Sequence, residues 1–490
     1  MHWPRGLRDR LMPSWARLAR TGLTFDRAYC SSSECSPSRA CLITGQYSNV
    51  NGVPRLLGSG MPTVHTLPNV ASVLAAEGYD VYWKGKWHLS FPVGFKGGPP
   101  SNEVWSDADI AAFRSKYDMR RWNPPDAGNA AGAYMPSAAA DAATRALTLR
   151  TTGGGVADND GRYVSGVLAG TRQAQGYGES ALDLIGRLGK TRRAARRPFA
   201  IFISLVNPHD ITFFPNGWKD AGYHVPELAG LEVELPPNAN DDLANKPSIQ
   251  SAYRQALEAK VPFRDAHDTP VNYVNFYARL HATVEPHIQL LLDALDRHGL
   301  TRDAIIFRTA DHGELGLSHG LREKAYTAYE EMIHVPLVVS NPVLYPRPAA
   351  TDALYSHVDL MPTLTELAGG KAVGIGKSVV PVLRDPSRGV QDAVLFAFDD
   401  SFLLGDVPGS HIRALRDAQW TYAVYYGSKG GRFEYELYDN AADPGQLRNL
   451  TKQPSAQIER QWRRLHHRLV AKMTQADAVP PGFTFAASPS

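Results

Sequence analysis

Two apolar runs that end in polar residues constrain the fold of this chain most. Residues 198–206 (PFAIFISLV) and 304–309 (AIIFRT) have the composition of strands that are buried on both faces. Segments with helical periodicity lie at 67–77 and 272–298, and each is followed by a glycine. Pro286 should kink or restart the second helix. This alternation predicts an α/β fold with a mostly parallel sheet flanked by helices.

Polar residues follow both runs directly. The first run leads into Asn207, Pro208 and His209, and the second leads into Asp311. In an open α/β sheet, ligands bind at the carboxyl ends of the strands. His209 and Asp311 are therefore candidate site residues on position alone.

A different pattern occupies the last quarter of the chain. Three segments alternate apolar and polar residues as antiparallel strands do, and one further segment carries a helical apolar stripe: 411–415, 420–426, 433–438 and 455–473. We therefore expect a catalytic α/β domain over 1–375 and a smaller C-terminal α+β subdomain over 376–490.

Charge and hydropathy exclude several partners. Lys and Arg total 52 against 49 for Asp and Glu, a net charge of +3, which gives no field strong enough to favour nucleic acid or an anionic membrane. No apolar stretch reaches the roughly 18 residues of a membrane span, and the mean hydropathy is -0.29. The first ten residues show no apolar signal-peptide core, so a cytoplasmic location is expected.

The three cysteines, Cys30, Cys35 and Cys41, lie within twelve residues of one another. Their odd number makes a poor disulfide framework, and their spacing lacks the C-x-x-C pairs of thiolate zinc sites. Small buried thiols are the ordinary interpretation of such a cluster. The residues around Cys35 indicate a different role for that cysteine.

The segment Cys35 to Arg39 reads C-S-P-S-R and is followed by Thr44 and Gly45. It resembles the signature of the sulfatase family, C-x-P-S-R with a trailing T-G. The resemblance implies a fold of the alkaline-phosphatase type and oxidation of Cys35 to formylglycine by a maturation enzyme. Hydrated formylglycine offers one hydroxyl to attack sulfur and a second to expel sulfate afterwards, a route that a thiol lacks. Arg39 would polarise this diol and stabilise charge on the transferring group.

Two further motifs supply candidate catalytic residues. Gly85 to His88 (GKWH) resembles the family segment in which lysine and histidine hold the hydrated formylglycine. Alternation along an extended segment would turn Lys86 and His88 towards one site. His209 resembles the family histidine that protonates the leaving alkoxide.

The metal ligands come from a fourth motif. Thr309 to Glu314 (TADHGE) resembles the family segment whose Asp and its neighbour bind one divalent cation. The resemblance assigns Asp311, His312 and the oxidised Cys35 to this ion. His312 replaces the asparagine of many calcium-dependent members, so calcium and manganese both stay open. In 319–324 (HGLREK), Lys324 would contact a substrate oxygen.

The resemblance extends from about residue 13 to about residue 450, and it fails at one place. Family members begin with a strand that ends in acidic metal ligands, whereas residues 12–22 already resemble the helix that follows it. Two explanations stay open. Either about 15 to 25 residues upstream of Met1 belong to the working protein, or the chain is truncated and inactive.

The expected function is hydrolysis of a small-molecule sulfate monoester with formylglycine and one divalent cation. The alternative enzyme of the same superfamily hydrolyses a phosphonate monoester or phosphodiester. An inactive sulfatase-like binding protein is the third possibility. The alcohol part of the substrate would be recognised by variable loops, of which 124–166 is the longest candidate, and by the C-terminal subdomain.

Overall fold

The computed structural model describes the chain in twelve ranges, which leave out the expected loop at 124–166 apart from Val164: residues 5–56, 67–90, 111–112, 114–115, 164, 179–191, 197–219, 223, 231–264, 267–400, 403–428 and 433–479. The strands are β1 (Gly22–Tyr29), β2 (Asp80–Gly85), β3 (Phe199–Ser204), β4 (Ile306–Thr309), β5 (Leu337–Ser340), β6 (Ala349–Ser356), β7 (Ala393–Phe398), β8 (His411–Asp417), β9 (Trp420–Tyr426) and β10 (Glu434–Asp439).

The α-helices of the described ranges are α1 (Arg5–Leu11), α2 (Pro13–Arg20), α3 (Cys35–Thr44), α4 (Ser48–Asn51), α5 (Val70–Ala76), α9 (Ala181–Lys190), α10 (Ser248–Lys260), α11 (Pro270–Arg297), α12 (Glu330–Ile333), α13 (Leu360–Leu367), α14 (Val380–Arg384) and α15 (Ala456–Gln475). Short 3-10 helices follow three of the strands or loops: η3 (His209–Phe213), η5 (Ser318–Gly320) and η6 (His357–Asp359).

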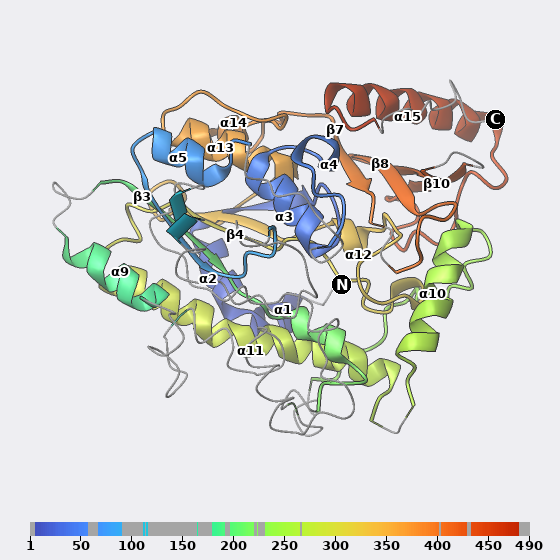
Figure 1. Ribbon diagram of the computed structural model, residues 1–490, viewed down its shortest axis with the longest axis horizontal. Coiled ribbons are helices and arrows are strands. Elements are labelled where there is room, and N and C mark those ends of the chain that lie inside the picture. The colour runs from blue at the N-terminus through green and yellow to red at the C-terminus, as the bar shows by residue number, and fades with distance from the viewer. Residues whose placement is uncertain are drawn as a thin grey trace.

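Helices cover both faces of the catalytic sheet, as Figure 1 shows, with α3, α5 and α13 on one side and α2, α9 and α11 on the other. The alternation of side chains along β2 and β3 explains this arrangement. Trp83 and Phe202 pack with α3 and α5, whereas Tyr82 and Ile201 pack with α9 and α11. Because successive side chains of a strand point to opposite faces, a continuous apolar run requires a helix layer on each side. The α/β fold expected from the sequence is thus confirmed.

Within the described ranges these strands form two sheets, a parallel pair β2-β3 and a mixed sheet in the order β4-β5-β1-β6, where one mostly parallel sheet was expected. β2 pairs with β3 and β1 pairs with β6 in parallel, but β5 runs antiparallel to both β1 and β4. An apolar run reports that both faces of a strand are covered, and it carries no information about the direction of the neighbouring strand.

β3 and β4 are half-buried along their length, although the sequence predicted strands buried on both faces. Within the described ranges, β3 pairs only with β2, and β4 pairs only with β5. One edge of each strand therefore has no described strand beside it.

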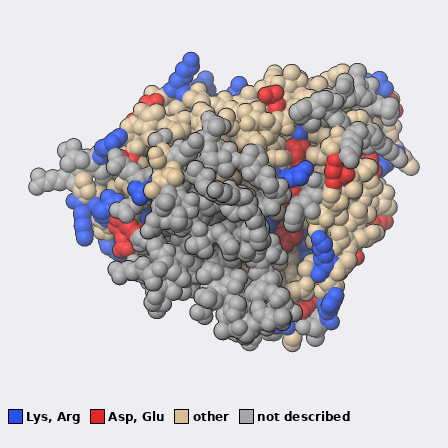
Figure 2. Space-filling view, viewed as in Figure 1, with Lys and Arg blue, Asp and Glu red and all other residues tan. Residues whose placement is uncertain are grey.

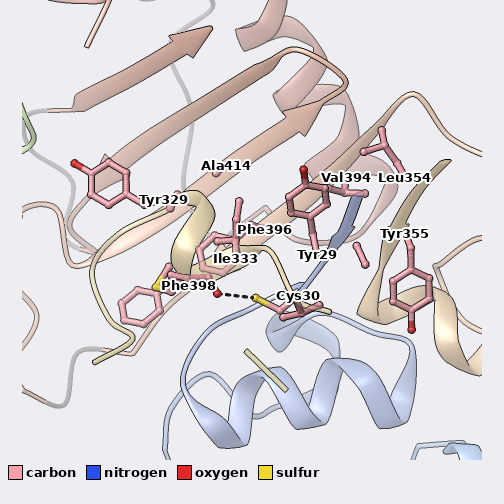
Figure 3. Close-up of a cluster of buried hydrophobic side chains, with 14 of the residues drawn as sticks. Tyr29, Cys30, Tyr329, Ile333, Leu354, Tyr355, Val394, Phe396, Phe398 and Ala414 are labelled. Carbon is pink, nitrogen blue, oxygen red and sulfur yellow. Dashed lines mark hydrogen bonds between the residues drawn. The ribbon is translucent and has the colours of Figure 1, made fainter. Parts of the chain in front are cut away.

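The C-terminal part forms the expected antiparallel sheet, in the order β10-β9-β8-β7, covered by α15 (Figure 1). Its inner face joins the catalytic sheet in one core. Figure 3 shows Tyr29 and Cys30 from the end of β1 near Phe396 and Phe398 of β7. Cys30 donates a long hydrogen bond from Sγ to the carbonyl oxygen of Met332, 3.7 Å away. The division at residue 375 stays a prediction.

Two further properties agree with the sequence. No helix in the described ranges combines the length and apolar character that crossing a membrane requires. On the face drawn in Figure 2, acidic and basic side chains lie interspersed over the described surface.

Candidate active site

Cys35 is the first residue of α3 and lies at the centre of the site. β1 delivers the chain to this helix through a short loop, and the thiol is 2% exposed. Glu34, which precedes it, has a φ of 63°, a left-handed conformation that is uncommon outside glycine and directs the start of the helix. The amino end of a helix carries a partial positive charge, so this position favours an anionic group.

Cationic side chains surround the Cys35 thiol. Lys86 Nζ lies 3.5 Å from Sγ and His312 Nε2 lies 3.4 Å from it. Burial alone would raise the pKa of this thiol, but Lys86, Lys324 and His312 hold it well below its ordinary value. By contrast, burial raises the pKa of the Cys41 thiol to about 12. The cations of the site therefore favour the ionised form of Cys35, whereas burial disfavours the ionised form of Cys41.

Lys86 and His209 reach Cys35 from adjacent parallel strands. Lys86 follows β2, and its backbone N–H donates to Ser204 O at the end of β3, 2.9 Å away. His209 opens η3, five residues after β3. Because the carboxyl ends of parallel strands meet at one edge, both side chains arrive beside the thiol, as the sequence predicted.

The His209 imidazole is uncharged near neutral pH. Burial, together with the nearby Lys86 and Lys324, lowers its pKa to about 3, although a hydrogen bond with Cys35 acts in the opposite direction. A neutral histidine beside the reacting atom carries one ring proton, which is positioned for hydrogen bonding in the cavity.

Arg39 lies one helical turn after Cys35, and its guanidinium is bound largely to protein atoms. Nε donates to Trp87 O at 2.7 Å, Nη2 donates to Lys86 O at 2.5 Å and to Ser204 Oγ at 2.8 Å, and Nη1 faces Asp311 Oδ2 at 3.4 Å. The side chain thus joins α3 to the ends of β2, β3 and β4. This placement points to a positioning contribution more than to direct contact with the transferring group.

Asp311 and His312 follow β4 and face the thiol. His312 Nε2 lies 3.8 Å from Asp311 Oδ1, and the donor atoms of Cys35, Asp311 and His312 all lie within 4.8 Å of one another. Burial would raise the pKa of Asp311, but His312, Lys86 and Arg39 hold it low. Burial would lower the pKa of His312, but Asp311 and Cys35 raise it to about 9. A carboxylate and an imidazole at this spacing fit one divalent cation.

Lys324 supplies the third cation. Its ammonium lies 3.3 Å from Glu323 Oε2. Burial would lower its pKa, but Glu323, Cys35, Glu34 and Glu314 raise it well above the ordinary value, so the side chain stays charged.

His88 departs from the predicted arrangement. It is buried, but its φ is 52°, so the segment after β2 is not extended at this point. The alternation that would have turned Lys86 and His88 to one side is therefore broken. Trp87 packs into the core beside Trp83, as expected, whereas His88 is absent from the described residues that line the cavity.

The site opens into a cavity of about 380 Å³. Six of the eight predicted catalytic or metal-binding residues are among those that line it: Cys35, Lys86, His209, Asp311, His312 and Lys324. Arg39 lies behind this wall. The volume suits a small ligand or the sulfated end of a larger one.

Sequence reasoning missed the residues that hold these groups in place. Ser38 Oγ donates to the carbonyl oxygen of Asp311 and lies 3.2 Å from His357 Nδ1. Glu314 stands within the motif at 309–314, but the motif alone assigns it no chemistry, and His357 lies outside the motifs given above. Ser204 and Tyr273 belong to no motif, so only the fold reveals them.

Comparison with known proteins identifies the family. The sulfatase family profile matches residues 5–370, and the profile described as N-sulphoglucosamine sulphohydrolase, C-terminal, matches residues 317–475. A Delta 4,5-hexuronate-2-O-sulfatase of Bacteroides thetaiotaomicron is 30% identical over 273 residues, which is 53% of this chain and 54% of that protein. The alignment thus spans about half of that relative.

Solved structures agree on the fold. A 2-O GAG sulfatase superposes with a TM-score of 0.67 at 20% identity, covering 98% of this chain and 90% of the other. The phosphonate monoester hydrolase of Agrobacterium radiobacter superposes with a TM-score of 0.64 at 20% identity, covering 95% and 91%. Since the first profile matches well over half of the sequence, the family expected from the motifs is confirmed: the chain belongs to the sulfatases, a family of sulfuric ester hydrolases.

Proposed function

We propose that this chain hydrolyses a sulfate monoester with formylglycine at position 35, formed from Cys35 by a maturation enzyme. The observation that carries the proposal is that Lys86, His209 and the Asp311–His312 pair surround the Cys35 side chain. In formylglycine, oxygen on Cβ takes the place of Sγ, so the same groups would surround the oxygens of the diol. Hydrated formylglycine supplies a geminal diol, one oxygen to attack sulfur and the other to release sulfate.

Four residues of the chain would stabilise charge, contact the leaving oxygen and position the site. Lys86 and Lys324 place two positive charges where the sulfuryl oxygens gain charge in the transition state. His209 lies beside position 35, where the N–H of its uncharged ring would donate a hydrogen bond to the leaving oxygen. Arg39 fixes the relative positions of α3 and the strand ends through its bonds to Lys86 O and Ser204 Oγ.

One divalent cation would be held by Asp311 and His312. Bound there, it would polarise a sulfate oxygen and favour ionisation of the nucleophile. The donor set of carboxylate and imidazole is compatible with manganese as well as calcium, so the metal is best identified by elemental analysis of the purified protein.

A mass measurement tests the nucleophile. The tryptic peptide from Ala28 to Arg39 contains Cys30 as well as Cys35. After denaturation and alkylation, a matured chain should carry one alkyl group on Cys30 and an aldehyde at position 35. Cys30 is an internal control for alkylation. A peptide with two alkyl groups in all of the protein would refute formylglycine at this site.

A comparison of turnover rates then distinguishes sulfate hydrolysis from phosphonate hydrolysis. The phosphonate alternative stays open because of His312 and because the fold is shared with a phosphonate monoester hydrolase. Matched aryl sulfate and aryl phosphonate monoester substrates should be compared on the same matured preparation. A higher kcat/KM for the sulfate supports the proposal. A preference for the phosphonate would assign the site to the alternative reaction, and no turnover of either by the oxidised chain would favour the inactive binding protein.

A further inference from the structure

Lys324 is carried by a loop, residues 314–324, whose backbone is unusual. Leu317, His319 and Glu323 have φ values of 70°, 56° and 65°. Residues other than glycine rarely adopt this left-handed conformation, and they keep it only where the surrounding contacts determine it. The contacts that shape the loop therefore also determine where the Lys324 ammonium lies.

One carboxylate oxygen accepts hydrogen bonds from both ends of this loop. Glu314 Oε1 accepts hydrogen bonds from the backbone N–H of Gly316 at 3.1 Å and from that of Glu323 at 2.8 Å. The backbone N–H of Leu315 donates to Glu323 O at 3.0 Å and closes the same base. Glu314 thus joins the two ends of the loop directly before Lys324.

The same oxygen is tied to the longest helix. Tyr273 of α11 donates its hydroxyl to Glu314 Oε1 at 2.7 Å. Its ring is 1% exposed and packs edge-on against Phe214 and Phe263, so the hydroxyl has little freedom to move. This buried carboxyl oxygen accepts three hydrogen bonds, and the one from Tyr273 is its link to α11, so removing that donor frees the base of the loop from the helix.

We propose that Glu314 and Tyr273 are positioning residues that place the Lys324 ammonium in the cavity and act on the sulfate group only through it. The inference rests on the proposed function for its effect on turnover. Its effect on anion binding does not, because Lys324 lines the cavity as a charged group whatever reaction occurs there.

A double-mutant cycle tests this. Tyr273→Phe removes the hydroxyl and keeps the ring, Lys324→Ala removes the ammonium, and the double variant combines them. Tyr345→Phe is the matched control, because its hydroxyl donates to Leu383 O at 2.6 Å in another part of the molecule. Each protein is assayed for affinity towards inorganic sulfate by calorimetry and for kcat and KM on an aryl sulfate.

Tyr273→Phe should weaken sulfate binding and lower kcat/KM by about fivefold to tenfold. In the Lys324→Ala background the same substitution should change both by less than about twofold, because the group it positions is gone. Tyr345→Phe should leave both unchanged. Glu314→Gln, which keeps an acceptor oxygen, should be less impaired than Glu314→Ala.

Multiplicative effects of Tyr273→Phe and Lys324→Ala would overturn the inference, as would an equal loss in Tyr345→Phe. If Glu314→Ala does not fold, the Tyr273 cycle decides alone. If no aryl sulfate is turned over but the two substitutions remain coupled in sulfate binding, the inference holds and the proposed function fails. If aryl sulfate is turned over but the two substitutions are not coupled, the proposed function holds and the inference fails.

Discussion

Cys35 differs from the other two cysteines in its electrostatic surroundings rather than in its burial. All three thiols are buried, but only Cys35 has Lys86, Lys324 and His312 beside it. A lowered pKa gives Cys35 a larger thiolate fraction than the other two cysteines, and thiolates react with alkylating reagents far faster than thiols.

In unmatured protein, Cys35 should therefore be alkylated by iodoacetamide under native conditions near pH 7, whereas Cys30 and Cys41, whose pKa values burial raises, should not react. Peptide mass spectrometry after timed quenching measures the three rates. Lys86→Met should slow the Cys35 reaction, because the pKa of the thiol rises when this cation is removed. Equal rates at the three cysteines would contradict the electrostatic argument.

Arg39 gives a second prediction at this scale. Arg39→Lys keeps the charge, but an ammonium cannot span Trp87 O, Lys86 O and Ser204 Oγ together. The variant should lose about a hundredfold in kcat/KM and about 2 to 4 kcal/mol of unfolding free energy, because buried carbonyl oxygens lose their donors. Steady-state kinetics and urea denaturation measure the two effects. Lys472→Arg on α15 is a remote control that should retain wild-type values.

At the scale of elements, α11 crosses the back of the sheet, as Figure 1 shows, and buries ionisable residues against it. His281 lies on this helix. Burial and the nearby Arg308 lower its pKa to about 3, against about 6.5 in an unfolded chain. Because the unfolded state binds the proton more readily, this histidine lowers the stability of the fold as the pH falls from about 6.5 towards 3, by about 1.4 kcal/mol per pH unit.

His281→Phe should therefore flatten the loss of unfolding free energy between pH 6.5 and 4, even if it lowers stability at pH 7. Urea denaturation at a series of pH values gives the slope. His467→Gln, on the exposed face of α15, should leave the slope unchanged. An identical slope for wild type and His281→Phe would show that this imidazole is protonated equally in both states.

The elements that the sequence revealed share one property, an unbroken pattern. It is a continuous apolar run in the strands and a helical periodicity in the helices. β3, β4, α11 and α15 were predicted to within a few residues, although α11 continues through Pro286 as one helix. β1 was missed because its pairing with β6 shifts register between Phe25 and Arg27, which interrupts the alternation of buried and exposed residues. The candidate catalytic groups were predicted because they stand in motifs. Tyr273 was not, since it lies 41 residues before its partner Glu314 and only the tertiary fold brings them together.

At the scale of the whole molecule, the four-stranded sheet that contains β1 and the C-terminal sheet share a core. Residues of β1 and β5 belong to the same buried cluster as Val394, Phe396 and Ile412 of the C-terminal sheet. Burial of apolar area across such an interface couples the stabilities of its two sides.

We therefore expect one cooperative unfolding transition in scanning calorimetry, with a calorimetric enthalpy equal to the van't Hoff enthalpy. A fragment of residues 1–375 should expose this core and fail to fold on its own. Phe396→Ala should lower the midpoint without splitting the transition. Two separate transitions, or a folded 1–375 fragment, would establish independent domains.

Because α11 is long, a small tilt of the helix would displace the residues far from its fixed point. It has 28 residues, which span about 42 Å, and Glu285, which binds Arg308 of β4 and Ser14 of α2, lies about 18 Å along it from Tyr273. A tilt of about 2° about Glu285 would move the Tyr273 hydroxyl by about 0.6 Å, a displacement large enough to change a rate. If Tyr273 positions Lys324 as proposed, the contacts of Glu285 with Arg308 and Ser14 would help to set where the Lys324 ammonium lies in the cavity.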